Sequence, residues 1–542
     1  MSREAFVRKA TGLTREWSLW NAFQFAYLAV PYTVFTSFVV LFVALSYPGV
    51  GFYLATLVCA VFGSIALFSY TSLCCAFPRS GADYVLISRI VHPAAGFMMS
   101  ETMYFVCYFL WQAYTSWFVM EFGVTPALIA TGFILNNATI SAMGLWTATP
   151  IGLYVIGAIF IVVCTALLMP GMKYFFKVQW VVFVWALVHS IVMLAIFATS
   201  SQDYFIQRFN EFVQFLNPQM TDAYHQIIDS AVQAGVDLNP SLSWASTTAA
   251  IPYVWMGVSY SAQMTMQVMG EIKRAESIKR IGGGMILASL VGLAFGAIFW
   301  GLINNVVGTE FLYAISYAFG SGANPLPTAP YWLYFGLILT SSVPLVWLTA
   351  MGFGPMQMAF GNSTNVPITG TRILFSVSFD RLFPKSAWLT TLHKRWRSPV
   401  NAYVFWIISS LIALAFFVFI PQLQAWLLAA VFSNVLIQTM TQICAAAFPF
   451  RMKDAFKASP IGKYMVGRVP LITITGIIGI AFYVFILIEG ILVPGIGLFT
   501  TETLTTIIVC YIFFIIFFYV MRAYRMRQGI EVDLAYKAIP PE

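Results

Sequence analysis

The stretch IPYVWMGVSYSAQ at residues 251–263 places hydrogen-bonding side chains inside a long apolar run. Pro252 removes a backbone donor and Gly257 tolerates non-helical angles, so both favour an interrupted helix. In lipid, such interruptions persist only where the freed backbone groups line a protein cavity. We therefore predict a solute site at this stretch. The residues expected to line it are Tyr253, Trp255, Met256, Gly257, Ser259 and Tyr260.

A second interrupted stretch, NAFQFAYLAVPYTVF at residues 21–35, carries Pro31 and several polar side chains. Two interrupted segments at corresponding places in the two halves of a chain are typical of transporter sites near the bilayer midplane. The alternative is that Pro and Gly are simply common in membrane helices. The residues expected to contribute from this stretch are Ala29, Val30, Pro31, Tyr32 and Thr33.

Two further polar groups are candidates for the same site. Cys107, Trp111 and Gln112 lie about one helical turn apart, which would let them face the interrupted stretches or form a packing stripe. The stretch GNSTNVPITG at 361–370 interrupts another apolar run. Its hydroxyls at Ser363 and Thr364 are oxygen ligands that suit a hard cation. The alternative is that these hydroxyls bond their own backbone, as hydroxyls in membrane helices usually do.

The elements that position these residues must be membrane helices. Apolar residues make up 60% of the 542 and charged residues only 9%, whereas a soluble protein has about 25% charged residues. Apolar runs long enough to cross a bilayer recur along the whole chain. The start, MSREAFVRKATGLTREW, lacks the pattern of a cleavable signal peptide. We predict twelve spans, at 20–45, 52–76, 97–120, 150–169, 176–199, 246–269, 282–306, 336–375, 399–420, 423–449, 470–493 and 503–521.

The net charge of +8 is explained by the topology of the chain. With the N-terminus inside, 27 of the 28 basic residues fall on the cytoplasmic side, and Arg208 is the exception. The loop at 201–245 carries five acidic residues instead. Because this distribution follows the positive-inside rule, we predict a multi-pass protein of the plasma membrane with both termini cytoplasmic. The positive charge therefore gives no reason to predict a nucleic-acid partner.

The chain offers little enzyme chemistry. It has seven cysteines and four histidines, with no CxxC motif and no Cys/His cluster, so neither a disulfide framework nor a metal site is predicted. No nucleophile–base pair can be placed at membrane depth, so we predict no catalytic residue, no cofactor and no enzyme activity. Ionisable residues within the spans are few, with Glu101 and Glu489 near span ends and His189 in the fifth span.

Four stretches together resemble the amino acid–polyamine–organocation permeases. FPRSGADYVLISRIVHPAAGF at 77–97 is similar to the family's loop between helices 2 and 3. GVSYSAQ followed by GEIK at 270–273 resembles the sixth helix and its cytoplasmic exit. GMKYFFKVQ at 171–179 resembles the start of helix 5. TRILFSVSFDRLFP at 371–384, with RSP at 397–399, resembles the end of helix 8 and its following loop.

The resemblance implies an all-α fold of the leucine-transporter type, with two inverted repeats of five helices, two C-terminal helices, and helices 1 and 6 broken. The amphipathic run FIQRFNEFVQFL in the loop at 201–245 predicts a lid or an interfacial helix on the outer surface. The implied segments are an N-terminal stretch at 1–19, repeats at 20–200 and 246–449, the loop at 201–245, the last two helices at 470–521 and a cytoplasmic tail at 522–542.

Three features depart from the family's pattern or bear on coupling. Where relatives carry Gly–x–Gly in helix 1, this chain has Tyr32, Thr33 and Val34. The lysine of proton-coupled relatives falls at about Ala186 here, which leaves His189 as the proton candidate. In sodium-coupled relatives, helix 8 hydroxyls join helix 1 carbonyls around a sodium ion. The matching groups here are Ser363 and Thr364 with the carbonyls of Ala26 and Ala29.

The resemblance implies a secondary active transporter that moves an amino acid or small amine by alternating access. Two alternatives remain: a nutrient receptor on the same fold, and an ion-independent exchanger. A channel is disfavoured, because no continuous polar face or ring of charges runs through a span. The expected coupling ion is Na⁺ or H⁺, the expected partners are the substrate and the bilayer, and the expected oligomeric state is a monomer or a homodimer.

Overall fold

The computed structural model describes residues 15–29, 47–328, 332–352, 362–420, 426–492 and 500–536. Most of these residues are helical, as the apolar runs of the sequence predict. The two named strands, β1 (Met465–Val466) and β2 (Val469–Pro470), pair antiparallel in a short hairpin.

The first part of the chain forms helices that are joined in places by π-helical turns. The α-helices are α1 (Leu19–Ala29), α3 (Phe52–Val58), α4 (Ser64–Ala76), α5 (Ala82–Ile90), α6 (Pro93–Thr102), α7 (Leu110–Val119), α8 (Thr125–Ile134), α9 (Ala138–Thr147), α10 (Pro150–Ala166), α11 (Met172–Thr199), α12 (Gln202–Leu216) and α13 (Ala223–Gln233). The π-helical turns are η1 (Cys59–Gly63), η2 (Met103–Phe109) and η3 (Met120–Val124).

The second part of the chain is also helical. Its α-helices are α14 (Trp244–Met266), α15 (Ile278–Val307), α16 (Thr309–Gly320), α17 (Trp332–Ile338), α18 (Val343–Met351), α19 (Asn362–Phe379), α20 (Ser386–Leu389), α21 (Val400–Phe419), α22 (Trp426–Arg451), α23 (Lys453–Ala458), α24 (Leu471–Leu492) and α25 (Thr501–Arg527). Two short 3₁₀ turns, η4 (Met269–Glu271) and η8 (Val532–Tyr536), follow α14 and α25.

Eight helices among the described residues are long and apolar enough to cross a membrane. The count rises to nine if α9 and α10, which meet at 73°, form one bent span. Five of the eight closely match predicted spans: Phe52–Ala76, which α3, η1 and α4 form together, and the helices α11, α15, α21 and α24. The full set of twelve spans remains a prediction, because part of the first span lies outside the described residues.

The predicted end of the third span is wrong. The helix continues from Pro93 to Ile134, over 42 residues, instead of ending near residue 120. Pro126 does not end it, because this proline is the second residue of α8, and η3, which ends at Val124, already interrupts the regular helical hydrogen-bond pattern.

The predicted break in the sixth helix is also wrong. The backbone of α14 is helical without interruption from Trp244 to Met266, with Pro252 inside. A proline within a membrane helix is tolerated when neighbouring elements pack around it, and α14 packs against α1, α3, α15 and α24. The eighth predicted span is divided, in contrast, because α17 ends at Ile338 and α18 begins at Val343.

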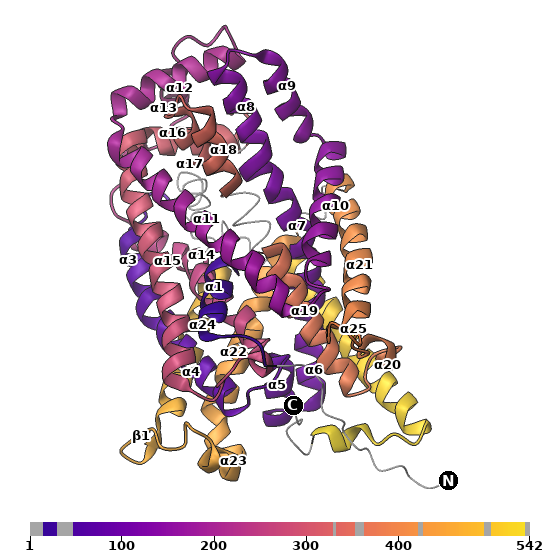
Figure 1. Ribbon diagram of the computed structural model, residues 1–542. Coiled ribbons are helices and arrows are strands. Elements are labelled where there is room, and N and C mark those ends of the chain that lie inside the picture. Colours follow the sequence, from indigo (N-terminus) through magenta and orange to yellow (C-terminus); the bar gives the residue numbers. More distant parts are fainter. Residues whose placement is uncertain are drawn as a thin grey trace.

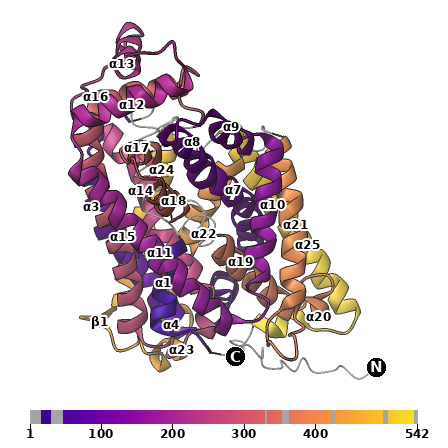
Figure 2. The same ribbon diagram turned by 45° about the horizontal axis from the view of Figure 1, so that its top comes forward.

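The bundle has two distinct ends (Figure 1). At one end, named here the far end, lie α12, α13 and α16. The opposite end carries α5, α20, α23 and β1, and is named here the terminal end. Figure 2 turns the far end forward, and in both views α10 and α21 run side by side along one edge, where they pack together.

The segment at 201–245 contains the predicted amphipathic helix. Within α12, the side chains of Phe205, Phe209 and Phe212 are fully buried, whereas Asp203 is exposed. The helix packs against α13, α15 and α17. It therefore forms part of a cap over the far end of the bundle, together with α13 and α16.

Candidate substrate site and terminal gate

The two stretches that the sequence singled out lie next to each other and run in opposite directions. At the terminal end, Trp17 pairs with Ile272, just after α14. At the far end, Val50 pairs with Ser243, just before α14. Because the segment before α1 meets the exit of α14 and residue 50 meets its entry, the first span and α14 are antiparallel, and α1 packs directly on α14.

Four helices meet around the end of α1. α1 packs against α14 and α19, α14 also packs against α19, and α19 packs against α7. These helices carry most of the predicted site residues. Ala26 and Ala29 are fully buried at the end of α1, and Ser363 and Thr364 are fully buried at the start of α19.

The direct link between α1 and α19 is made by a residue that the sequence analysis did not select. Asn365 is buried, and its Nδ2 donates a hydrogen bond to the carbonyl of Phe25 at 3.0 Å. The bond connects residues 340 positions apart in the sequence. Polarity alone could have drawn attention to Asn365, which stands next to Thr364, but no local pattern identifies its partner.

Ser363 contacts a different helix. Its Oγ lies 3.3 Å from the Oγ1 of Thr115 on α7, so it links α19 to the third span. Thr115 and Ser116 both donate hydrogen bonds to the carbonyl of Gln112. The proposed sodium ligands thus lie close to α1 and α7, but the contact recorded for Ser363 joins it to α7.

Gln112 is the most informative of the predicted residues on α7. Its side chain is fully buried, and neither Oε1 nor Nε2 has a hydrogen-bond partner among the described residues. Gln112 precedes Thr115 by three positions, so both occupy the same face of α7, the face from which Thr115 reaches α19. Buried polar groups are nearly always hydrogen-bonded, so an amide in this state is available to a ligand.

Three of the five predicted aromatic residues have described side chains, and each contacts a different aromatic ring. Trp111 is half-buried and its ring centroid lies 5.3 Å from that of Tyr114. Tyr253 meets Tyr47 edge-on, with centroids 5.8 Å apart. Trp255 is fully buried and packs edge-on against Tyr483 of α24, at 5.4 Å.

Several predicted contributors fall outside the description. Val30, Pro31, Tyr32 and Thr33 lie in the undescribed range 30–46. For five further positions the structure gives the helical backbone but not the side chain, namely Cys107, Met256, Gly257, Ser259 and Tyr260. Their place in the site remains a prediction.

α11 contains the two positions considered for proton coupling, Ala186 and His189. Ala186 is fully buried, and its carbonyl accepts a hydrogen bond from Ser190. Nearer the terminal end, Gln179 donates through Nε2 to the carbonyl of Asn21 at 3.0 Å and lies 3.4 Å from Gln24 Oε1. His189 is fully buried and faces Gly352 at the end of α18, where any added side chain would collide with it.

The terminal end is closed by a set of polar contacts named here the terminal gate, formed by Trp17, residues 80–83, residues 267–273 and Arg372. The N–H of Trp17 donates to the carbonyl of Glu271 at 3.1 Å, and the N–H of Lys273 donates to the carbonyl of Trp17 at 2.9 Å. The N–H of Gly81 donates to the carbonyl of Gln267 at 2.8 Å. Gly81 has a φ of +71°, and a side chain there would collide with Ser376.

Buried charges strengthen the gate. Arg372 of α19 forms a two-pronged ion pair with Glu271, with Nε–Oε1 at 2.5 Å and Nη2–Oε2 at 3.1 Å, and Nη1 also donates to Tyr403 at 3.0 Å. The carboxylate of Asp83 accepts from Tyr70 at 2.5 Å and from Gln267 at 2.6 Å. The exit of α14 is therefore bound to the segment before α1, to α5 and to α19.

Sequence reasoning missed the gate. The stretches 77–97, GEIK at 270–273 and 371–384 were selected only for their resemblance to family motifs. The structure brings these three stretches together through Asp83, Glu271 and Arg372. The sequence did carry one signal for the gate. Asp83, Glu271 and Arg372 lie at the ends of apolar runs, and charges that are buried there need partners.

Within the described ranges, no group of three His, Cys, Asp or Glu side chains is placed to hold a metal ion. No match was found among curated proteins. A family profile described as amino acid permease matches residues 18–518, which include both stretches singled out in the sequence and every part of the terminal gate except Trp17. This chain is therefore a multi-pass membrane protein that belongs to the amino acid permeases of the amino acid–polyamine–organocation family.

Proposed function

We propose that the protein is a secondary active transporter that moves an amino acid or a small amine by alternating access, with its terminal end in the cytoplasm. The observation that carries this proposal is the terminal gate. It closes one end of the bundle by ion pairs and hydrogen bonds between α14, α5, α19 and the segment before α1. Polar contacts of this kind can be exchanged for water when the end opens.

The substrate site lies, on this proposal, where α1, α7, α14 and α19 meet. Gln112 offers a buried amide that can donate to a carboxylate and accept from an ammonium group. A neutral site of this kind favours a zwitterion or a small amine over a strongly charged solute.

Uptake into proteoliposomes tests the proposal against a receptor on the same fold. Purified protein is reconstituted, and a panel of radiolabelled amino acids and amines is offered outside the vesicles, with empty vesicles as the control. A transporter accumulates label that a later ionophore or detergent releases. Saturable binding without any accumulation in the lumen, in vesicles with and without unlabelled substrate inside, would favour the receptor.

The coupling ion is a separate question, and Asn365 bears on it. Its amide N–H is bonded to the carbonyl of Phe25, which joins α1 to α19 beside the candidate sodium ligands Ser363, Thr364 and the carbonyls of Ala26 and Ala29.

Imposed gradients separate the three coupling modes. Uptake is compared under a sodium gradient, under an acid-outside pH gradient without sodium, and with only unlabelled substrate inside the vesicles. Exchange predicts that internal substrate alone drives uptake. Stimulation by sodium that is lost in Ser363→Ala/Thr364→Ala would support sodium symport instead, whereas stimulation by acid that is lost in His189→Ala would support proton coupling.

A further inference from the structure

The end of the described chain returns to the terminal gate. After α25, the chain turns back and forms η8, in which Val532 and Ala535 are buried. Val532 belongs to a hydrophobic cluster that includes Val85 of α5, Phe97 of α6 and Val377 of α19. A segment that is remote in sequence therefore packs on the three elements beside the gate.

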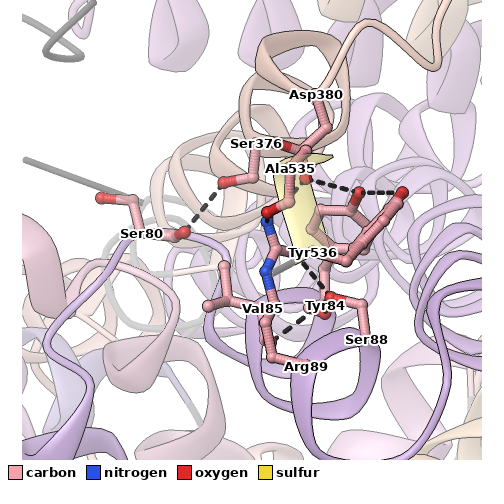
Figure 3. Close-up of polar contacts among 9 residues, drawn as sticks. All are labelled: Ser80, Tyr84, Val85, Ser88, Arg89, Ser376, Asp380, Ala535 and Tyr536. Atoms are coloured by element: carbon pink, nitrogen blue, oxygen red, sulfur yellow. Dashed lines mark hydrogen bonds and ion pairs between the residues drawn. The ribbon is translucent and has the colours of Figure 1, made fainter. Parts of the chain in front are cut away.

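The polar contacts of η8 converge on one ion pair (Figure 3). Arg89 Nη2 lies 2.8 Å from Asp380 Oδ2, and the hydroxyl of Tyr84 donates to the same oxygen at 2.8 Å. The hydroxyl of Tyr536 lies 3.1 Å from that of Tyr84. The carbonyl of Ala535 lies 3.4 Å from Arg89 Nη2.

The ring of Tyr536 also covers this ion pair. The guanidinium carbon of Arg89 lies 5.0 Å from the ring centroid of Tyr536 and 5.3 Å from that of Tyr84. The side chains of Arg89 and Asp380 are only 3% and 1% exposed. Burial raises the pKa of the Tyr84 phenol well above its usual value, so the hydroxyl stays protonated and donates to the carboxylate. Exclusion of water strengthens such a pair, because its charges are less screened.

α5 connects this ion pair to the gate. Gly81, directly before α5, and Asp83, in its first turn, hold Gln267 at the exit of α14. Arg89, in its last turn, holds Asp380 just beyond α19. Ser376 of α19 also donates to the carbonyl of Ser80 at 2.8 Å. Any contact that fixes α5 against α19 therefore also fixes the element that grips the exit of α14.

We propose that η8 is a latch that docks on Tyr84 and Arg89, holds α5 against α19 and so keeps the terminal gate closed. When η8 leaves, water reaches the ion pair between Arg89 and Asp380, α5 gains freedom, and the exit of α14 is released. The inference rests on the proposed alternating access and adds a regulatory contact to it. The alternative is that η8 only covers the end of α25.

Hydrogen–deuterium exchange in nanodiscs tests the latch. The variant is Tyr536→Ala, and its matched control is Leu534→Ala, which removes an exposed side chain from the same turn. The reporters are the amide of Gly81 and those of residues 267–273. Because amide exchange follows the free energy of local opening, we expect Tyr536→Ala to speed exchange at the reporters about tenfold and Leu534→Ala to change it less than about twofold.

Tyr536→Phe separates the two contacts of the side chain. It keeps the ring over Arg89 and removes only the hydroxyl bonded to Tyr84, so we expect an increase of about two- to threefold at the same reporters. Exchange in α24, which has no part in the gate, shows whether a variant is folded. If Tyr536→Ala also loosens α24, the comparison of Tyr536→Phe with Leu534→Ala decides the question.

The latch is overturned if both Tyr536 variants match Leu534→Ala at the reporters and differ from it only within residues 530–536. This readout needs no substrate, so it fails independently of the transport proposal. Uptake by the unmodified protein, together with unchanged exchange at the reporters in both Tyr536 variants, would contradict only the latch proposal. Faster exchange at the reporters in the Tyr536 variants, together with an unmodified protein that binds substrate but never accumulates it, would contradict only the transport proposal.

Discussion

The two ends of the molecule are closed by different kinds of contact. At the far end, aromatic rings do the packing. Phe311 of α16 stacks on Tyr224 of α13 with centroids 4.3 Å apart and meets Phe209 of α12 edge-on at 5.0 Å. At the terminal end, the contacts are polar and directional, and they centre on the buried ion pairs Glu271–Arg372 and Arg89–Asp380.

This difference has consequences for motion. Apolar rings pack without strict directionality, so a shift of a few tenths of an ångström costs such a cap little. A buried ion pair depends on its geometry and becomes costly as soon as one partner is lost. The far end is therefore suited to move as a packed unit. The terminal end is suited to change between a bonded and a hydrated arrangement, as an opening gate requires.

The largest effect is expected from breaking the gate's central ion pair. Arg372→Leu leaves the carboxylate of Glu271 buried without its partner, so the free energy of unfolding should fall by about 3–5 kcal/mol. Reversible unfolding in mixed micelles measures the change. The double variant Glu271→Leu/Arg372→Leu should recover most of the loss, because an apolar pair of similar volume needs no counter-charge. A double variant as unstable as the single one would contradict this account.

A smaller loss is expected at the far end. Phe311 is fully buried, so Phe311→Ala should lower the free energy of unfolding by about 3 kcal/mol through lost burial and a cavity. The matched control is Phe319→Ala in the same helix, where the ring is 36% exposed and the loss should stay below about 1 kcal/mol. Hydrogen exchange should rise in α12, α13 and α16 and stay unchanged at Gly81. Faster exchange at Gly81 would mean that the two ends do not behave separately.

Two buried glutamines between the ends offer an intermediate test. Gln179→Leu removes hydrogen bonds to α1 and should lower the free energy of unfolding by about 1–3 kcal/mol. Gln112→Leu removes an amide without a described partner, so its effect on stability should stay within about 1 kcal/mol. Substrate affinity, measured by binding to purified protein, should fall about tenfold in Gln112→Leu if that amide binds the ligand. Normal affinity in Gln112→Leu would place the substrate elsewhere.

The smallest effect is expected from an exposed ion pair at the same end as the gate. Arg522 and Asp533 are 34% and 50% exposed, so Arg522→Gln should change the free energy of unfolding by no more than about 0.5 kcal/mol. Unfolding at low and high salt measures this change. A loss above about 1 kcal/mol would show that the packing of η8 on α25 depends on this pair, and that burial alone does not determine which ion pairs contribute strongly to stability here.

Local sequence patterns predicted much of the fold. The apolar runs at 176–199, 282–306 and 470–493 became α11, α15 and α24 with shifts of a few residues, because the length of an apolar run reflects the thickness of the bilayer. The amphipathic run in 201–245 became α12, because its phenylalanines recur at helical spacing. The break at Pro252 was predicted wrongly, since the local penalty of a proline was outweighed by packing on the surrounding helices.

The candidate site was predicted less well, for a physical reason. Polar residues in apolar runs are visible in the sequence, and Gln112, Ser363 and Thr364 were selected in this way. Their partners are not visible. The bond from Asn365 to Phe25 spans 340 positions, and that between Tyr84 and Tyr536 spans 452. No periodicity encodes contacts over such separations.

The sequence by itself determined that this protein lies in a lipid bilayer, where most of its membrane helices are, and to which family it belongs. All three conclusions depend on local composition, the length of apolar runs and short motifs. The tertiary structure decided which charges meet and which end of the bundle is held by them. Ion pairs such as Glu271–Arg372 form only when the chain path brings distant helix ends together. Once buried, each charge depends on its partner for the stabilisation that water gave it in the unfolded chain.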